Sequence, residues 1–137
     1  MDLAGQATEH QTLIDAAIEA RLAAYAPYSE FQVGAALLCD GGEIITGCNV
    51  ENLSYGLTIC AERNAIFAAA AKGHQKFAAI AVAADTEKPI SPCGACRQVM
   101  CEFGDFPVIL ANLRGAVVES SVGALLPRGQ TGILDRD

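Results

Sequence analysis

The chain lacks an uninterrupted apolar run of membrane-spanning length, although 52% of its 137 residues are hydrophobic. A transmembrane helix needs about 20 consecutive apolar residues, so the sequence predicts no membrane span. The first residues also lack a basic stretch followed by an apolar one, which is the pattern of a secretory signal peptide. We therefore expect a cytoplasmic protein without membrane contact.

Positive charge is scarce. Nine Lys and Arg stand against 16 Asp and Glu, which gives a formal net charge of −7. The sequence has no cluster of basic residues and no basic strip with interleaved aromatics. Proteins that bind polynucleotides neutralise phosphates with such residues. The composition therefore argues against a nucleic-acid partner and favours a small neutral substrate.

Internal repeats, low-complexity tracts and linkers are also absent, so the length predicts a single domain over residues 1–137 with one hydrophobic core. Hydrophobic periodicity and turn signals predict helices at about 9–24, 60–71, 93–103 and 122–126. They predict a β-hairpin of 31–39 and 43–47, and further strands at 77–84, 107–111 and 116–120. This order predicts a three-layer α/β/α sandwich around a five-stranded mixed sheet.

Two segments together supply three thiols and one carboxylate. The first is Cys-Ala-Glu-Arg at 60–63, and the second is Pro-Cys-Gly-Ala-Cys-Arg-Gln at 92–98. Both open predicted helices, and successive helices of a right-handed crossover start at the same end of a sheet. Cys60, Cys93 and Cys96 can therefore meet. Three protein ligands leave a fourth position open for water, which is typical of a catalytic zinc ion.

The start of a helix also suits this chemistry. Free backbone N–H groups and the helix dipole favour thiolate over thiol. Glu62 is not needed as a ligand, so it can move protons between a water molecule and a substrate ring nitrogen. Three thiolates around Zn²⁺ leave a net charge of −1, and the neighbouring Arg63 and Arg97 are candidates to offset it.

Other interpretations of the cysteines remain open. Pro-Cys-x-x-Cys by itself also occurs as half of a structural zinc site or as a redox pair. A redox pair leaves Cys60 and Glu62 unexplained, and no second Cys-x-x-Cys supplies a structural fourth ligand. Residues available as a fourth ligand are Cys39, Cys48, Cys101 and His74. We expect these three cysteines to be buried free thiols, because the cytosol keeps thiols reduced.

Along nearly its whole length the sequence resembles the small homotetrameric cytidine deaminases, whose zinc signature includes Pro-Cys-x-x-Cys. The resemblance rests on matched motifs at 25–29, 31–36, 47–52, 54–63 and 91–98. It implies one Zn²⁺ per subunit on Cys60, Cys93 and Cys96, with Glu62 as the proton shuttle. It also implies that Arg63 softens the charge of the thiolates.

The resemblance further implies a set of substrate contacts. Asn49 and Glu51 correspond to the pair that binds the sugar hydroxyl, and Phe31 to an aromatic residue against the pyrimidine. The backbone of Ala61 and the turn at 91–92 would contact the polar edge of the base. Tyr55 lies in a segment that reaches across subunit interfaces in this family, so each active site of the expected homotetramer would be shared.

Without the resemblance these contacts have simpler explanations. Asn-x-Glu-Asn at 49–52 is common in loops, and Phe31 alone fits a core strand. One position departs from the family pattern: Gln130 stands where an aromatic residue often follows Pro127. This departure concerns how the base is covered and leaves the metal ligands and Glu62 untouched.

These observations predict a zinc-dependent hydrolase that deaminates cytidine and 2′-deoxycytidine in pyrimidine salvage. A deaminase of another aminopyrimidine nucleoside, such as a nucleoside antibiotic, is the nearest enzymatic alternative. Asn49 and Glu51 favour an ordinary ribose against it. A non-catalytic structural zinc module is the alternative from a different class.

Overall fold

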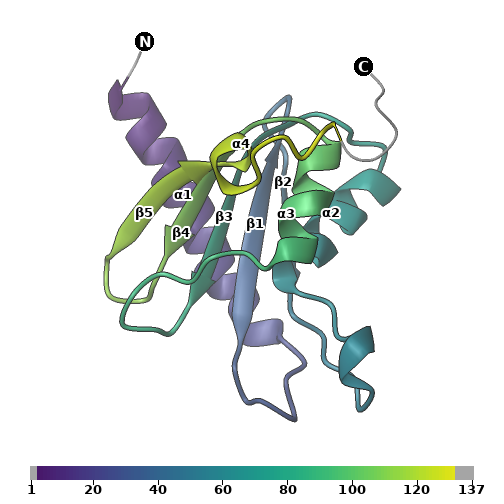
Figure 1. The fold of residues 1–137 in the computed structure, drawn as a ribbon. Helices are drawn as coiled ribbons and strands as arrows, with labels where there is room; N and C mark the ends of the chain where they lie inside the picture. The colour runs from purple at the N-terminus through teal and green to yellow at the C-terminus, as the bar shows by residue number, and fades with distance from the viewer. Residues whose placement is uncertain (1–2, 132–137) are drawn as a thin grey trace.

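A computed structural model describes residues 3–131, with side chains from residue 8 onward. Figure 1 shows a central sheet with α1 on one face and α2 and α3 on the other. The strands are β1 Val33–Cys39, β2 Ile44–Cys48, β3 Phe77–Ala84, β4 Pro107–Ala111 and β5 Val117–Ser121. The α-helices are α1 Leu3–Ala20, α2 Ala61–Ala71, α3 Gly94–Glu102 and α4 Val122–Leu125. The predicted three-layer sandwich is confirmed.

The sheet has the order β2-β1-β3-β4-β5 and mixes both pairing types. β3 and β4 pair in parallel, while the other neighbours are antiparallel. The predicted hairpin joins β1 to β2 through Gly41 and Gly42, whose φ angles are +106° and +102°. Only glycine adopts such angles readily, so this pair of residues explains why the chain reverses here.

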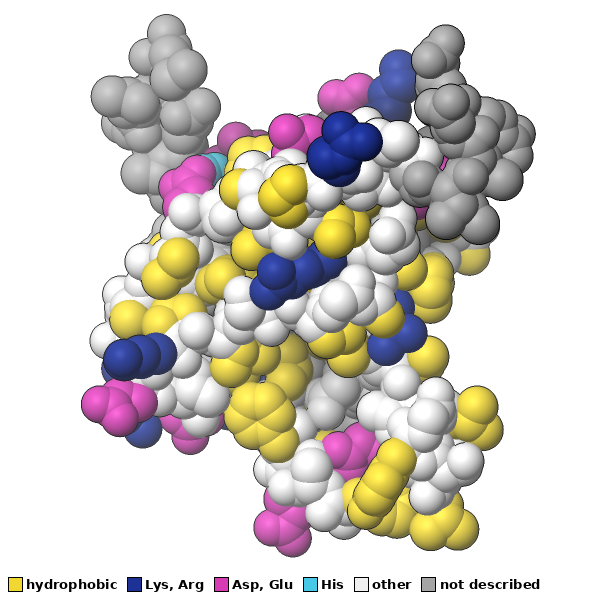
Figure 2. Space-filling model, viewed as in Figure 1, with side chains coloured by type: hydrophobic (Ala, Val, Ile, Leu, Met, Phe, Trp, Pro, Cys, Tyr) yellow, Lys and Arg dark blue, Asp and Glu magenta, His cyan; other side chains and the backbone are white. Residues whose placement is uncertain are grey.

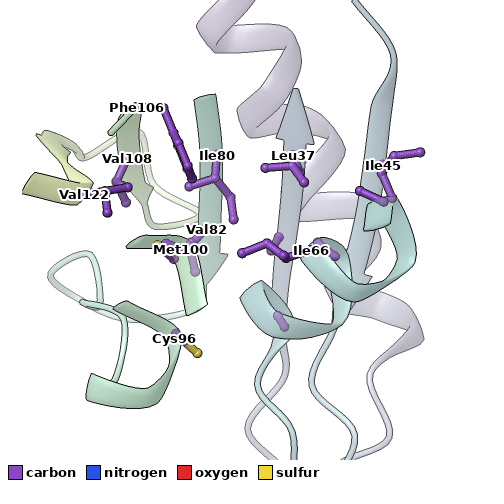
Figure 3. Packing of buried hydrophobic residues seen from close by; sticks show 14 of the residues in the cluster. Leu37, Ile45, Ile66, Ile80, Val82, Cys96, Met100, Phe106, Val108 and Val122 are labelled. Atoms are coloured by element: carbon purple, nitrogen blue, oxygen red, sulfur yellow. The ribbon is translucent and has the colours of Figure 1, made fainter. Parts of the chain in front are cut away.

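Each face of the sheet carries its own apolar layer because side chains alternate along a strand. Leu37, Ile80 and Val82 pack under α2 and α3, in the cluster drawn in Figure 3. The opposite face presents small residues, such as Ala36 and Ala81, to α1. The small residues let α1 lie close to the sheet, while the larger ones fill the space under two helices.

The elements differ from the sequence prediction mainly at α1. The helix starts at Leu3 rather than near residue 9, in a stretch that contains the good helix formers Leu3, Ala4, Gln6 and Ala7 but no apolar stripe. It ends at Ala20 and tightens into a 3₁₀ turn, η1 Arg21–Ala23. The backbone then becomes extended, because Tyr25 pairs with Val50 in a short β-bridge. None of the helices in the described range is long and apolar enough to cross a membrane.

Candidate active site

α2 and α3 begin next to each other and bring three sulfur atoms together. Cys60 is the N-cap of α2 and Cys93 the N-cap of α3, both with extended backbone angles. Their Sγ atoms are 3.7 Å apart, and the Sγ atoms of Cys93 and Cys96 are 3.4 Å apart. All three sulfurs lie within 4.8 Å of one another. In Figure 3, Cys96 projects from α3 toward the side on which α2 lies.

The thiol cluster fits a zinc ion. Four ligands about 2.3 Å from a tetrahedral centre are about 3.8 Å apart, close to the observed sulfur separations. Cys96 is buried, while Cys93 is exposed, so the cluster is open to solvent on one side. A hydrogen bond with Cys96 lowers the pKa of Cys60 to about 5, and the same bond raises the pKa of Cys96. Holding all three as thiolates therefore calls for a cation among them.

Glu62 lies beside the cluster without belonging to it. It occupies the first turn of α2, and only 3% of its surface is exposed. Burial raises the pKa of its carboxyl, and the neighbouring Cys60 thiolate raises it further. Hydrogen bonds with its own backbone N–H and with Cys96 act in the opposite direction. A buried carboxyl within reach of the thiols is the geometry expected of a general acid and base.

The two arginines have different roles. Arg63 Nη2 donates to Cys60 Sγ at 3.6 Å, as expected of a group that offsets thiolate charge. Arg97 instead binds oxygen: Nε donates to Pro92 O at 2.8 Å and Nη1 to Leu125 O at 2.9 Å. Its Nη2 donates to Ser91 Oγ at 3.3 Å. These three hydrogen bonds of Arg97 therefore anchor the loop before Cys93.

Both residues of the expected sugar-binding pair make hydrogen bonds within the protein. Asn49 Oδ1 accepts from Val33 N–H at 2.9 Å, and its Nδ2 donates to Phe31 O at 2.8 Å. Glu51 accepts from the backbone N–H groups of Tyr28 and Ser29. Asn49 is buried, and its two hydrogen bonds order the start of β1. The contact between Glu51 and residues 28–29 was not predicted, since no local pattern links residues 22 positions apart.

Two short backbone bridges place the 49–51 segment beside the start of α2. Val50 pairs with Tyr25 on one side and with Ile59 on the other. Ile59 directly precedes Cys60, so the 49–51 segment and the turn after Tyr25 adjoin the start of α2. The segment between β2 and α2 is thus ordered by backbone pairing and contains a 3₁₀ turn, η2 Tyr55–Leu57.

The remaining predicted site residues differ in exposure. Ala61 is buried at the first position of α2, with its backbone at the thiol end. Phe31 is 39% exposed and Tyr55 is 75% exposed. Tyr55 packs edge-on against Tyr28 across 6.1 Å between ring centres. Phe31 is thus not the core strand residue that its position alone suggests.

Gln130 lies apart from the thiol cluster, on a cavity of about 240 Å³ between α3 and the segment after α4. Its Nε2 donates to Cys101 O at 3.2 Å. Cys39 and Cys101 are buried free thiols as predicted, whereas Cys48 is only half-buried. Burial raises the pKa of each of these three thiols. None of these three thiols lies in the metal-ligand cluster. His74 also lies outside it, and its Nε2 is 2.7 Å from Glu43 Oε2.

A thiol trio open on one side, with a buried carboxyl beside it on an α/β/α sandwich, defines a zinc-dependent deaminase type of site. The model of the cytidine and deoxycytidylate deaminase zinc-binding region matches residues 7–112. The chain belongs to this family.

Known proteins extend the match to nearly the whole chain. The cytidine deaminase of Halalkalibacterium halodurans is 56% identical over 121 residues, which cover 87% of this chain and 92% of that protein. That of Sporosarcina psychrophila is 55% identical over 119 residues, covering 85% and 88%. The crystal structure of cytidine deaminase from Burkholderia pseudomallei superposes with a TM-score of 0.84 at 56% identity, covering 86% and 96%.

Arg97 offers a test of how the Cys93 loop is held. Arg97→Lys keeps the charge but cannot reproduce a planar fork that reaches three acceptors. We expect zinc to pass to a chromogenic chelator about 10 to 100 times faster than from the wild type, as for other groups that support metal ligands. Arg114→Lys, which alters an exposed pair with Asp85, should release zinc at the wild-type rate. Equal release from both variants would contradict the anchoring role of Arg97.

Proposed function

We propose that the protein hydrolyses cytidine to uridine and ammonia, and that it also accepts 2′-deoxycytidine. Glu62 carries the proposal, because a buried carboxyl next to three thiols that can hold the metal without it supports a role in proton transfer. Membership of the deaminase family supports a hydrolytic reaction at a zinc site. The names of the relatives at 55–56% identity support cytidine as the substrate.

In this proposal each site residue has one task. Cys60, Cys93 and Cys96 hold one zinc ion per subunit. Bound zinc lowers the pKa of a water molecule to near 7 and so supplies a nucleophile at neutral pH. The Glu62 carboxylate accepts the two protons of the attacking water in turn. It delivers the first to the ring nitrogen N3 and the second to the amino group, which leaves as ammonia.

The loop residues select the nucleoside. Asn49 and Glu51 contact the sugar hydroxyl, Phe31 lies against the pyrimidine, and the backbone of Ala61 meets the polar edge of the base. Glu51 suits its task because the hydroxyl of Ser29 and two backbone N–H groups lower its pKa and keep it ionised. An ionised carboxylate accepts hydrogen bonds only, which matches a hydroxyl donor.

We also propose a homotetramer with shared active sites, working in the cytoplasm in pyrimidine salvage. Large apolar side chains on the loops below the sheet support association: Leu53 is 79% and Leu57 is 65% exposed, next to Tyr55. Figure 2 shows hydrophobic side chains gathered on these loops at the bottom of the view. Such an apolar group on a water-soluble chain is typical of a surface that another subunit covers.

A nucleoside panel tests the function. Ultraviolet absorbance and ammonia release should show turnover of cytidine and 2′-deoxycytidine, with one ammonia for each uridine. Free cytosine should be at least about 100 times poorer in kcat/KM, because it lacks the sugar that Asn49 and Glu51 contact. Removing zinc with a chelator should abolish turnover, and adding zinc should restore it. Turnover that survives verified zinc removal, or cytosine as good as cytidine, would contradict the proposal.

A further inference from the structure

The carboxylate of Glu51 is fixed by the turn that precedes Phe31. Its Oε1 accepts from the N–H of Tyr28 at 2.9 Å and from the N–H of Ser29 at 3.1 Å. Its Oε2 accepts from the hydroxyl of Ser29. A carboxylate offers about four acceptor positions, so about one is left on Oε2 for a substrate hydroxyl. The turn and the 49–51 segment therefore form one hydrogen-bonded unit.

The hydroxyl of Ser29 extends this unit to Phe31. While its proton goes to Glu51, Ser29 Oγ accepts from the N–H of Phe31 at 3.0 Å. One oxygen atom thus connects the carboxylate expected at the sugar with the backbone of the residue expected at the base. Between the two, Glu30 has a φ of +59°, in the left-handed region that non-glycine residues adopt only when other contacts hold them there.

This unit lies at the thiol end of the molecule. The bridges between Tyr25 and Val50 and between Val50 and Ile59 set the turn, the 49–51 segment and Cys60 next to one another. Ser29 itself is exposed and its bonds are directed to the protein. Its position therefore suits a residue that orients others rather than one that reacts.

We propose that Ser29 is a positioning residue that couples sugar recognition by Glu51 to base recognition by Phe31. The inference rests on the proposed nucleoside deaminase function and specifies how the site would select a whole nucleoside. Without the Ser29 hydroxyl, Glu51 keeps only backbone donors and the N–H of Phe31 loses its acceptor. Both halves of the nucleoside site then lose their fixed orientation together, while the thiols and Glu62 stay in place.

Steady-state kinetics with cytidine test the coupling. Ser29→Ala should raise KM about tenfold or more, as expected for loss of a hydrogen bond to a charged group, with kcat within about threefold of the wild type. Ser29→Thr keeps the hydroxyl at an exposed site and should return KM to within about threefold. Thr12→Ala removes a hydroxyl that donates to Thr8 O on α1, and should leave both constants unchanged.

A double-mutant cycle with Glu51→Gln separates positioning from a merely structural role. If Ser29 acts partly through Glu51, the two substitutions together should raise KM by clearly less than the product of their separate effects. Independent effects would multiply, and that result would overturn the inference, as would a wild-type KM for Ser29→Ala. Far-ultraviolet circular dichroism confirms that each variant is folded. A wild-type protein that does not turn over cytidine would instead overturn the proposed function.

Discussion

Glu62→Gln should reduce kcat for cytidine by about 10³-fold or more while the protein stays folded and keeps its zinc. Gln has nearly the shape of Glu but cannot take up and release protons, and a positioned acid and base is worth about 10²–10⁴ in rate. Zinc should remain because the three thiols make a complete ligand set without Glu62. The free energy of unfolding should not fall, because the substitution removes a buried ionisable group.

The measurements are kcat, zinc content and a denaturation curve on the same preparation. Glu102→Gln is a matched control, because Glu102 is exposed at the end of α3, away from the start of that helix. It should have wild-type kcat. A zinc-loaded Glu62→Gln enzyme with near-native kcat would show that the proton transfers use another group. Loss of zinc from the variant would instead place Glu62 among the ligands.

Gly47→Ala should damage both stability and activity, because β2 meets α2 at this residue without space for a side chain. A Cβ at position 47 would be 2.4 Å from Ala65 N and 2.6 Å from Ala61 O. These are backbone atoms of α2, so relief requires the helix to move. Overpacking of this kind costs about 1–3 kcal/mol and at times more. Since α2 carries Glu62 and follows Cys60, a shift of about 1 Å should lower kcat by about 100-fold.

Thr46→Ala provides the control for Gly47→Ala, since Thr46 is the preceding residue of β2 and is exposed. It should leave kcat unchanged and lower the free energy of unfolding only slightly. Urea denaturation and kcat at saturating cytidine measure the two effects. Native stability together with native kcat in Gly47→Ala would contradict the contact between β2 and α2 as the support of the site.

Much of the site follows from local rules that can be recognised in a sequence. The start of a helix can be recognised from a few consecutive residues, and each of the two cysteine motifs lies at such a start. A right-handed crossover then brings the two starts to one end of the sheet, which predicts that Cys60 and Cys93 meet. The hairpin is equally local, because Gly41 and Gly42 meet the backbone requirement of its turn by themselves.

Other features of the site depend on residues distant in the chain. The partner of Glu51 is Ser29, 22 positions earlier, and the guanidinium of Arg97 reaches Leu125, 28 positions later. Proximity to Cys96 in the sequence suggested that Arg97 offsets thiolate charge, but its side chain points to carbonyl oxygens instead. Residues that are neighbours in the sequence lie close together in space. The direction of a long side chain, however, depends on which hydrogen-bond acceptors the packed elements bring near it.

By itself the sequence determined which three thiols and which carboxylate form the site, and the sandwich that brings them together. Hydrophobic periodicity and helix starts depend on residues close together in the chain, so they can be recognised from the sequence. Only the tertiary structure decided that Glu51, Ser29 and Phe31 form one unit, that Arg97 anchors the Cys93 loop, and that Gly47 leaves no space beneath α2. Each of these arrangements depends on a contact between distant residues: Gly47 with Ala61, Ser29 with Glu51, and Arg97 with Leu125. Such residues meet only when the sheet and helices pack, so no pattern of neighbouring residues predicts the contact.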